Sequence, residues 1–333
     1  MPVLEVRDLE VSFGSTKILR GVSFDLEAGQ TLGVVGESGC GKSMTGFAVM
    51  GMLQSPGKIT GGSIKLEGNE LVGLPEKEMR HIRGRDIALV MQDPFTSLNP
   101  MMRVGDQIAE SMVLHQGKRW DEARKLAVEM LDKVGVPDPP NSARKFPHQM
   151  SGGQRQRVVI AIAFACRPKV LIADEPTTAL DVTLQAQILR LLEDLQREEG
   201  TAVMLVSHDI GAIATISQRI AVFYAGQIVE TGPAHEVLGR AAMPYTRSLL
   251  NALPRLGQTR LEAIGGFPPD FANLPEGCPF RPRCPLRFHK CEVEPKLMPV
   301  EPGHVAACWR AEEVRDMAPG MPLVREASEH PLT

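Results

Sequence analysis

Apolar and polar residues alternate along the first thirty positions, which is the pattern of strands with one buried face. Turn residues at Gly14-Ser15 and Ala28-Gly29 interrupt the alternation. The pattern therefore predicts an N-terminal β subdomain. Its apolar positions are Leu4, Val6, Leu9, Val11, Phe13, Val22, Phe24 and Leu26.

Short apolar strands and helical stretches follow in alternation, as in an α/β core. Strands are expected over 31–35, 170–173 and 201–207, with a helix over 184–198. The segment from about 93 to 157 differs, because it is rich in helix formers and closes with turn residues. The sequence thus predicts an α/β fold with a helical insertion.

Prolines become frequent and periodicity weakens near residue 254, so a boundary is expected there. Residues 1–253 would form the main domain, and residues 254–333 a small irregular C-terminal extension. Four of the six cysteines fall in this extension. In a cytosolic protein such a cluster suggests a metal site before disulfides. The four are Cys278, Cys284, Cys291 and Cys308.

The composition narrows the class of protein. Of 333 residues, 43% are hydrophobic and 23% charged, which is typical of a globular protein. The net charge of −3 gives no reason to expect a nucleic acid as partner. A transmembrane helix needs about 20 consecutive apolar residues, and no apolar run in this chain is that long. The N-terminus lacks the features of a signal peptide. We therefore expect a cytoplasmic protein that is peripheral if it works at a membrane.

The clearest motif spans residues 36–43, where Gly-Glu-Ser-Gly-Cys-Gly-Lys-Ser matches G-x-x-x-x-G-K-[ST] between a predicted strand and a predicted helix. The glycines let consecutive backbone N–H groups turn toward phosphates, and the helix adds its positive N-terminal end. Lys42 is expected to reach the β and γ phosphates, and the Ser43 hydroxyl to ligate Mg²⁺. The alternative is a glycine-rich turn without a ligand. The motif indicates a P-loop NTPase. It identifies neither the base of the bound nucleotide nor the process that hydrolysis drives.

A pair of carboxylates, Asp174 and Glu175, ends the strand predicted over 170–173. The first carboxylate suits Mg²⁺, directly or through water. The second is placed to polarise an attacking water molecule. The alternative is a buried strand with an ordinary acidic end.

A third motif, Ser151-Gly152-Gly153-Gln154, precedes an apolar helical run. Ser151 is a suitable N-cap, and the start of this helix offers a second anion site. One nucleotide does not need both sites from one chain. Two chains arranged head to tail would use both, each supplying one half of each site. The alternative is a plain N-cap with a flexible Gly-Gly start.

Together these motifs resemble those of ABC ATPases over roughly residues 3–240. Ser-Gly-Gly-Gln precedes Asp174-Glu175, while Gln92 and His208 each follow an apolar run. The resemblance implies a P-loop NTPase (ABC ATPase) core with an N-terminal antiparallel β subdomain and a helical signature subdomain. It also implies ATP hydrolysis, with Mg²⁺ as cofactor and a second ABC ATPase subunit, a copy or a paralogue, as partner.

The same resemblance assigns roles to individual residues. Glu175 would be the general base, and His208 would contact the γ-phosphate and order the attacking water. Gln92 would sense Mg²⁺ near the membrane subunit, with Ser43 and Asp174 also at the metal. The implied nucleotide-binding residues are Phe13, Gly36, Ser38, Gly39, Cys40, Gly41, Lys42, Ser43 and Met44 in one subunit, and Ser151, Gly152, Gly153 and Gln154 in the other.

Phe13 and Cys40 of the expected nucleotide site each have a second interpretation. Phe13 stands where the family usually has an aromatic residue that stacks on adenine, most often Tyr. The alternative is that Phe13 belongs to the core. Cys40 is expected to be a small loop residue without a catalytic role. Its place beside a helix N-terminus nevertheless favours a lowered thiol pKa and reaction with thiol reagents.

Residues 92–100 and 166–183 are similar to the dipeptide, oligopeptide and nickel importer branch, as is Pro244-Tyr245-Thr246. The branch usually has His where this chain has Met243. The resemblance implies uptake of peptides or related solutes, energised from the cytoplasmic side of the plasma membrane. Two transmembrane permease subunits and an extracytoplasmic solute-binding protein are the implied partners. The alternatives are an importer of nickel or another small solute, and a non-transport ABC ATPase of DNA repair.

Three ligation states are open for the cysteine cluster. Four thiolates can hold Zn²⁺ or a [4Fe–4S] cluster. Structural zinc sites favour shorter spacings within each ligand pair than this chain has. Extensions of this kind carry a [4Fe–4S] cluster in some members of the branch, so the resemblance favours that cluster. Zinc and unligated thiols are the alternatives.

Overall fold

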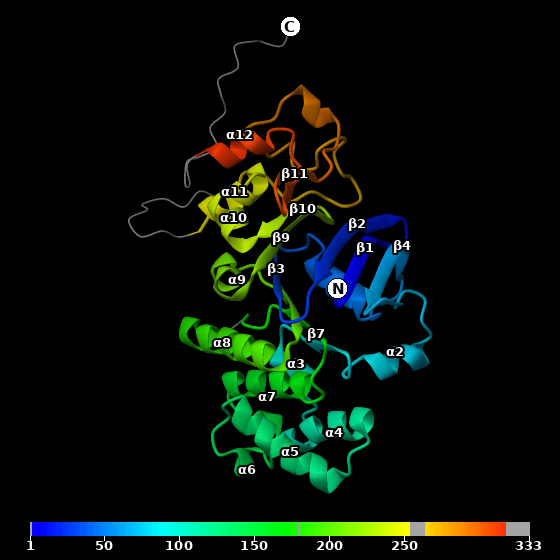
Figure 1. Ribbon diagram of the computed structural model, residues 1–333, viewed down its shortest axis with the longest axis vertical. Helices are drawn as coiled ribbons and strands as arrows, with labels where there is room; N and C mark the ends of the chain where they lie inside the picture. Colours follow the sequence, from blue (N-terminus) through cyan, green and yellow to red (C-terminus); the bar gives the residue numbers. More distant parts are fainter. Residues whose placement is uncertain (1, 179, 254–263, 318–333) are drawn as a thin grey trace.

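The computed structural model describes residues 2–178, 180–253 and 264–317. Figure 1 shows an elongated molecule, with a helical subdomain at one end of its long axis and the C-terminal extension at the other. Two β-sheets lie between these ends. The expected boundary at residue 254 lies outside the described residues.

The alternating N-terminal segment forms an antiparallel sheet in the order β2-β1-β4-β5. Apolar side chains on its inner face, including Leu4 and Val6, are fully buried, so the predicted N-terminal antiparallel subdomain is confirmed. Its strands are β1 Leu4–Phe13, β2 Thr16–Leu26, β4 Gly57–Leu66 and β5 Asn69–Glu70, and helix α2, Glu76–Ile82, follows them.

The main sheet of the described residues has eight strands in the order β11-β12-β10-β9-β3-β8-β7-β6. Strands β6, β7, β8, β3 and β9 are parallel, and every residue of β3, β7 and β8 is buried. Such burial explains why these strands appear in the sequence as continuous apolar runs. The strands are β3 Thr31–Val35, β6 Ile87–Val90, β7 Val170–Asp174, β8 Ala202–Val206, β9 Arg219–Tyr224, β10 Gln227–Pro233, β11 Met298–Glu301 and β12 His304–Ala306.

The helical subdomain is inserted between β6 and β7. Its apolar stripe includes Ala123, Ala127 and Leu131 of α5, which recur every four residues and are buried, as an amphipathic helix requires. Its elements are α3 Pro94–Ser97, α4 Val104–Gln116, α5 Trp120–Lys133, α6 Pro139–Ser142, the 3₁₀ turn η1 Pro147–Gln149, and α7 Gly152–Phe164.

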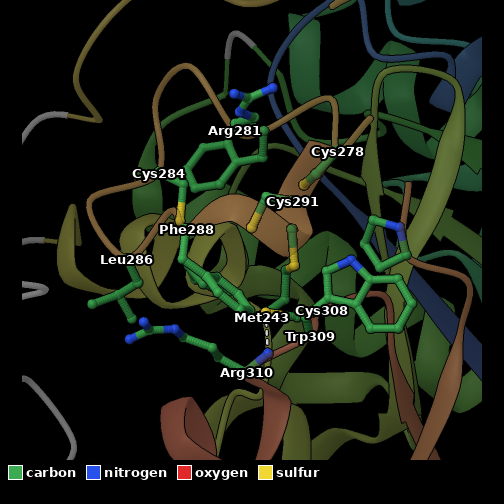
Figure 2. Close-up of a pocket in the computed structure, with 13 residues that line it drawn as sticks. Met243, Cys278, Arg281, Cys284, Leu286, Phe288, Cys291, Cys308, Trp309 and Arg310 are labelled. Carbon is green, nitrogen blue, oxygen red and sulfur yellow. Dashed lines mark hydrogen bonds between the residues drawn. The ribbon is translucent and has the colours of Figure 1, made fainter. Parts of the chain in front are cut away.

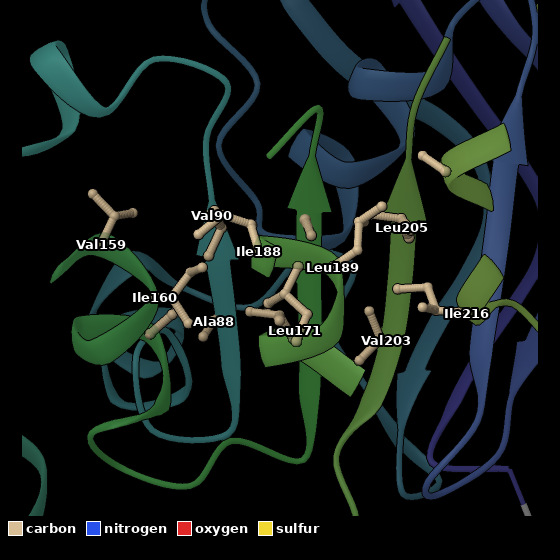
Figure 3. Close-up of a cluster of buried hydrophobic side chains, with 14 of the residues drawn as sticks. Ala88, Val90, Val159, Ile160, Leu171, Ile188, Leu189, Val203, Leu205 and Ile216 are labelled. Atoms are coloured by element: carbon tan, nitrogen blue, oxygen red, sulfur yellow. The ribbon is translucent and has the colours of Figure 1, made fainter. Parts of the chain in front are cut away.

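The remaining helices cover the main sheet and join it to the insertion. Figure 3 shows Ile188 and Leu189 of α8 between β6, β7, β8 and α7, in one apolar cluster. This cluster continues into the helical subdomain, so the insertion and the sheet share a core. The helices are α1 Lys42–Val49, α8 Val182–Glu199, α9 Ile210–Ile216, α10 Ala234–Gly239 and α11 Pro244–Asn251.

The C-terminal extension is largely irregular over residues 264–297, and then adds β11 and β12 to the edge of the main sheet. Strand β12 pairs with β10 of the core, Glu230 opposite Ala306. The extension also contains the 3₁₀ turn η2, His289–Glu292, and helix α12, Ala311–Asp316. Among the helices of the described residues, none is long and apolar enough to cross a membrane.

Candidate nucleotide site and cysteine pocket

The phosphate loop connects β3 to α1, as the motif predicts. Gly36, Gly39 and Gly41 have φ values of 151°, 78° and 108°, a region that favours glycine. The amine of Lys42 donates to the carbonyl oxygens of Gly36 and Glu37, at 2.9 Å each. Only 5% of Lys42 is exposed. The lysine is thus folded back into its own loop, where a phosphate group would compete for it.

Strand β7 delivers Asp174 to the first turn of α1. The Ser43 hydroxyl donates to Asp174 Oδ1 at 2.8 Å. Burial raises the pKa of Asp174 above its ordinary value, and the neighbouring Glu175 acts in the same direction. A hydroxyl beside a carboxylate fits Mg²⁺, which usually binds one or two carboxylates together with waters and substrate phosphates.

The carboxylate of Glu175 lies at the centre of a polar cluster. Its Oε2 accepts from Gln92 Nε2 at 3.2 Å and from the Thr178 hydroxyl at 2.9 Å, and His208 Nδ1 lies 3.2 Å away. Glu175 has φ of 49°, a left-handed conformation that costs energy outside glycine and clusters at functional sites. The tertiary structure therefore brings Gln92, Glu175 and His208 together, as the resemblance implies.

Thr178 is a hydrogen-bond partner of Glu175 that the motifs did not indicate. Its position three residues after Glu175 is the signal that would have indicated it, because a hydroxyl there can reach back across a turn. Asp209, next to His208, caps α9 by accepting from the backbone N–H groups of Gly211 and Ala212. It also accepts from Gln185 at 2.6 Å.

Residues 151–154 form a complete capping box at the start of α7. The Gln154 N–H donates to Ser151 Oγ at 3.3 Å, and the Ser151 N–H donates to Gln154 Oε1 at 3.1 Å. Within the described residues, no hydrogen bond joins this box to the phosphate loop. A Cβ added to Gly152 would meet open space, whereas one on Gly153 would lie 2.5 Å from Leu184. In this chain the motif therefore acts as the N-cap of α7, with an open surface at Gly152.

The structure gives Phe13 and Cys40 surroundings that differ from those expected for the nucleotide site. Phe13 is half-buried and packs against Gly57 of β4, a position that suits the core alternative. Cys40 is 6% exposed, and burial raises the pKa of its thiol even though Lys42 acts against this. The expectation of a lowered thiol pKa at Cys40 is therefore wrong, because desolvation outweighs the helix end and the lysine.

Two residues from beyond the loop bind Glu37 in a way that no motif indicated. Arg283 of the extension donates to both carboxylate oxygens of Glu37, at 2.6 and 2.8 Å. The Glu37 N–H donates to the Tyr245 hydroxyl of α11 at 2.8 Å. The phosphate loop is thus in direct contact with the C-terminal part of the chain.

The four cysteines of the extension line one pocket, together with Met243, Phe288 and Trp309 (Figure 2). Burial raises the pKa of Cys284 and of Cys308 to about 12, and raises that of Cys278. Backbone N–H groups act against this effect. The Arg310 N–H donates to Cys308 Sγ at 3.3 Å, and those of Leu286 and Phe280 lower the pKa of Cys284 and Cys278.

The described residues contain no group of three or more His, Cys, Asp or Glu side chains placed to hold a metal ion. This holds for the cysteine pocket too, so the described residues give no support for either the expected [4Fe–4S] cluster or a zinc ion there.

The parallel sheet, the phosphate loop and the carboxylates beside it define a P-loop nucleoside triphosphatase. The ABC transporter family model matches residues 19–178. The model of the oligopeptide/dipeptide transporter C-terminal region matches residues 229–291. The chain belongs to the family of ABC transporter ATP-binding proteins, and it is an ATPase.

Two relatives illustrate the likeness. The chain is 48% identical over 317 residues to the oligopeptide transport ATP-binding protein OppD of Salmonella typhimurium, covering 93% of this chain and 94% of that protein. It is 46% identical over 319 residues to the dipeptide transport ATP-binding protein DppD of Bacillus subtilis, covering 93% of this chain and 95% of that one.

Solved structures give the same fold. A dimeric ATP-binding cassette in a post-hydrolysis state with ADP and Pi matches with a TM-score of 0.62 and 27% identity, covering 69% of this chain and 98% of that chain. The cbiO1 protein of Clostridium perfringens, part of the ABC transporter complex cbiONQ, matches with the same TM-score and identity over 71% of this chain and 90% of that chain.

Proposed function

We propose that Glu175 is the general base of ATP hydrolysis. The observation that supports this role is the convergence of Gln92, Thr178 and His208 on one oxygen of Glu175. A carboxylate that already accepts several hydrogen bonds is held in one orientation, as a base acting on a positioned water molecule requires. His208 then orders that water and contacts the γ-phosphate.

Lys42, Ser43 and Asp174 hold the phosphates and Mg²⁺ in this proposal. Lys42 leaves the carbonyls of its own loop for the β and γ phosphates, as a point charge. Ser43 and Asp174 bind Mg²⁺, with Gln92 close by. Mg²⁺ supplies neutralisation of the charge that develops on the phosphates. Phe13 stacks on adenine only if it turns away from its packing on Gly57.

Two subunits form each nucleotide site. The capping box of Ser151 and Gln154 leaves the face at Gly152 open, and a helix N-terminus with free N–H groups suits an anion. A matching solved structure of this fold is a dimer with ADP and Pi. We infer that Ser151, Gly152, Gly153 and Gln154 contact the γ-phosphate held by the other subunit, a copy or a paralogue of this chain.

The work driven by this site is import of dipeptides, oligopeptides or related solutes. The C-terminal family match and the names of the relatives support this assignment. The partners are two transmembrane permease subunits and an extracytoplasmic solute-binding protein, with this chain peripheral at the cytoplasmic face of the membrane. The matched C-terminal model describes peptide transporters, which favours peptides over nickel and transport over DNA repair.

A transport assay in cells tests the solute. Cells that lack this chain should lose uptake of labelled di- and oligopeptides, and the wild-type chain should restore it. The Glu175→Gln variant, which still binds ATP in this proposal, should not. Nickel uptake measured in the same cells is the competing outcome. If the wild-type chain restored nickel uptake and left peptide uptake unchanged, the chain would be the ATPase of a nickel importer.

The cysteine pocket is proposed to hold one [4Fe–4S] cluster bound by Cys278, Cys284, Cys291 and Cys308. The four thiols line one pocket, and four cysteine thiolates are the ligand set of a [4Fe–4S] cluster. Backbone N–H groups directed at the sulfurs stabilise thiolates, and such bonds tune Fe–S sites. The cluster would be structural, since binding free energy becomes folding free energy.

Metal analysis of the purified protein distinguishes a [4Fe–4S] cluster from zinc and from unligated thiols. Protein purified without oxygen should be brown and carry about four irons per chain. Cys278→Ser should lose the colour, whereas Cys166→Ser, at a buried cysteine of the core, should keep it. One zinc per chain in colourless protein would replace the cluster by zinc. Absence of metal after anaerobic reconstitution would leave unligated thiols.

A further inference from the structure

The C-terminal extension reaches the phosphate loop through one ion pair. Arg283 binds Glu37 with two parallel hydrogen bonds, at 2.6 and 2.8 Å. The two residues are 246 positions apart in the sequence. A bidentate pair of this kind fixes the orientation of both groups as well as their distance.

Arg283 is itself held in place. Its side chain is only 5% exposed, its Nε donates to the Gly265 carbonyl at 2.8 Å, and its Nη1 lies 3.4 Å from the Tyr224 hydroxyl. The guanidinium also lies 5.9 Å from the ring centres of Tyr224 and Phe280. Hydrogen bonding to Glu37 raises the pKa of Arg283, so the guanidinium is a fixed positive charge.

Glu37 transmits this constraint into the loop. Its side chain binds Arg283, its N–H donates to Tyr245, and its carbonyl oxygen accepts from the Lys42 amine at 2.9 Å. The backbone of the residue that holds Lys42 is therefore anchored at both its side chain and its N–H group. Movement of Arg283 would change the position of the Glu37 carbonyl, and with it the resting position of Lys42.

A cavity beside the loop shows a second contact of the extension with this region. It has a volume of about 460 Å³. Ser38, Gly39 and Cys40 of the loop line it, together with Thr16 and Ile18 of β2. Its other wall is residues 268–272 of the extension. The extension thus faces the phosphate loop from two of its segments.

We propose that Arg283 is a positioning residue of the nucleotide site, which acts through Glu37 to hold the phosphate loop ready for ATP. The inference rests on the ATPase activity and not on the transported solute or the metal in the cysteine pocket. Without Arg283 the Glu37 side chain loses its anchor, and the Glu37 carbonyl that accepts from Lys42 is no longer held in position. ATP should bind more weakly, while the chemistry at Glu175 is unchanged.

The first experiment compares steady-state ATPase kinetics of three variants with the wild type. Arg283→Ala should raise KM for ATP about tenfold with kcat within about twofold, the pattern of lost binding without lost chemistry. Arg283→Lys keeps the charge without the bidentate geometry, and should recover part of the affinity. Arg281→Ala is the matched control, because Arg281 lies in the same loop but pairs with Glu292. The control should match the wild type.

A double variant separates positioning from a purely structural tether. If Arg283 acts through Glu37, Arg283→Ala should have no further effect on KM in a Glu37→Ala background. Equal effects of Arg283→Ala with and without Glu37 would overturn the proposal. So would an unchanged KM for ATP in folded Arg283→Ala, even with a lower Tm. If Arg283→Ala does not fold, Glu37→Ala alone decides, because the proposal requires it to raise KM as well.

Discussion

The carboxylate of Glu230 and the imidazole of His304 lie 2.8 Å apart, and both side chains are fully buried. Glu230 belongs to β10 of the ATPase core and His304 to β12 of the extension. The same carboxylate accepts from the backbone N–H groups of Ala242 and Met243, at 2.7 and 3.1 Å. A buried polar group joins the two parts of the chain at the edge of the main sheet.

Replacing His304 by Ala should destabilise the protein strongly, because it leaves a buried carboxylate without its side-chain partner. The expected loss is about 3 kcal/mol in the free energy of unfolding. Thermal unfolding followed by circular dichroism measures it. His289→Ala, at an exposed position of the same extension, is the control and should change Tm little. Equal Tm values for the two variants would show that the pair adds nothing to stability.

Replacing Glu175 by Gln should keep ATP binding and lower kcat by at least about a hundredfold, the range expected for loss of a general base. Gln keeps the size of the side chain and an oxygen that can accept from Thr178. ATPase assays and binding of a fluorescent ATP analogue separate the two effects. The variant should also accumulate as a closed dimer with ATP trapped. Turnover close to that of the wild type would assign the base elsewhere.

Mixing two inactive variants tests the shared site. Lys42→Ala removes the phosphate-binding amine, and Ser151→Arg blocks the motif at the start of α7. In a mixed dimer both lesions can fall in one composite site, which leaves the other intact. ATPase activity should therefore rise above that of either variant alone. If the two sites fire independently, no gain on mixing would contradict the head-to-tail arrangement.

Replacing Asp174 by Asn should stabilise the nucleotide-free protein while abolishing hydrolysis. Burial raises the pKa of Asp174 above its ordinary value of 3.8. A raised folded-state pKa adds stability that is present below the unfolded value and is lost as the pH rises through the folded one. At pH 7 the charged carboxylate thus costs stability that Asn does not.

The gain in Tm should shrink as the pH falls and should level off below the ordinary carboxyl value of 3.8, because Asp174 is then neutral in both folded and unfolded chains. Melting curves over a series of pH values measure this trend. Asp194→Asn, at an exposed position of α8, serves as the control, with a small shift at every pH. A Tm of Asp174→Asn below that of the wild type at pH 7 would show that Ser43 and its surroundings compensate the charge.

Local sequence patterns were sufficient to predict most of the strands and helices of the ATPase core. The strands expected over 31–35 and 170–173 match β3 and β7, and the helix expected over 184–198 lies within α8. These elements could be predicted because hydrophobic periodicity records which face of a strand or helix is buried. The phosphate loop was equally clear, since phosphate binding needs glycines and a lysine at fixed spacing.

The contacts that join distant segments could not be predicted in this way. Glu37 and Arg283, and Glu230 and His304, carry no local signal that points to their partners. They become partners because the chain brings them together after folding, and no local pattern encodes a separation of 246 residues. The two strands that the extension adds to the sheet depend on pairing with β10, which a short segment does not specify by itself.

The α/β ATPase fold, the phosphate loop, the pair of carboxylates and the helix-capping motif could all be inferred from the amino-acid sequence, because each is specified by residues close together in the chain. The ion pair between Arg283 of the extension and Glu37 of the phosphate loop became visible in the folded molecule, as did the burial that raises the pKa of the Cys40 thiol. Both depend on desolvation and on partners from other segments, which are properties of the packed molecule.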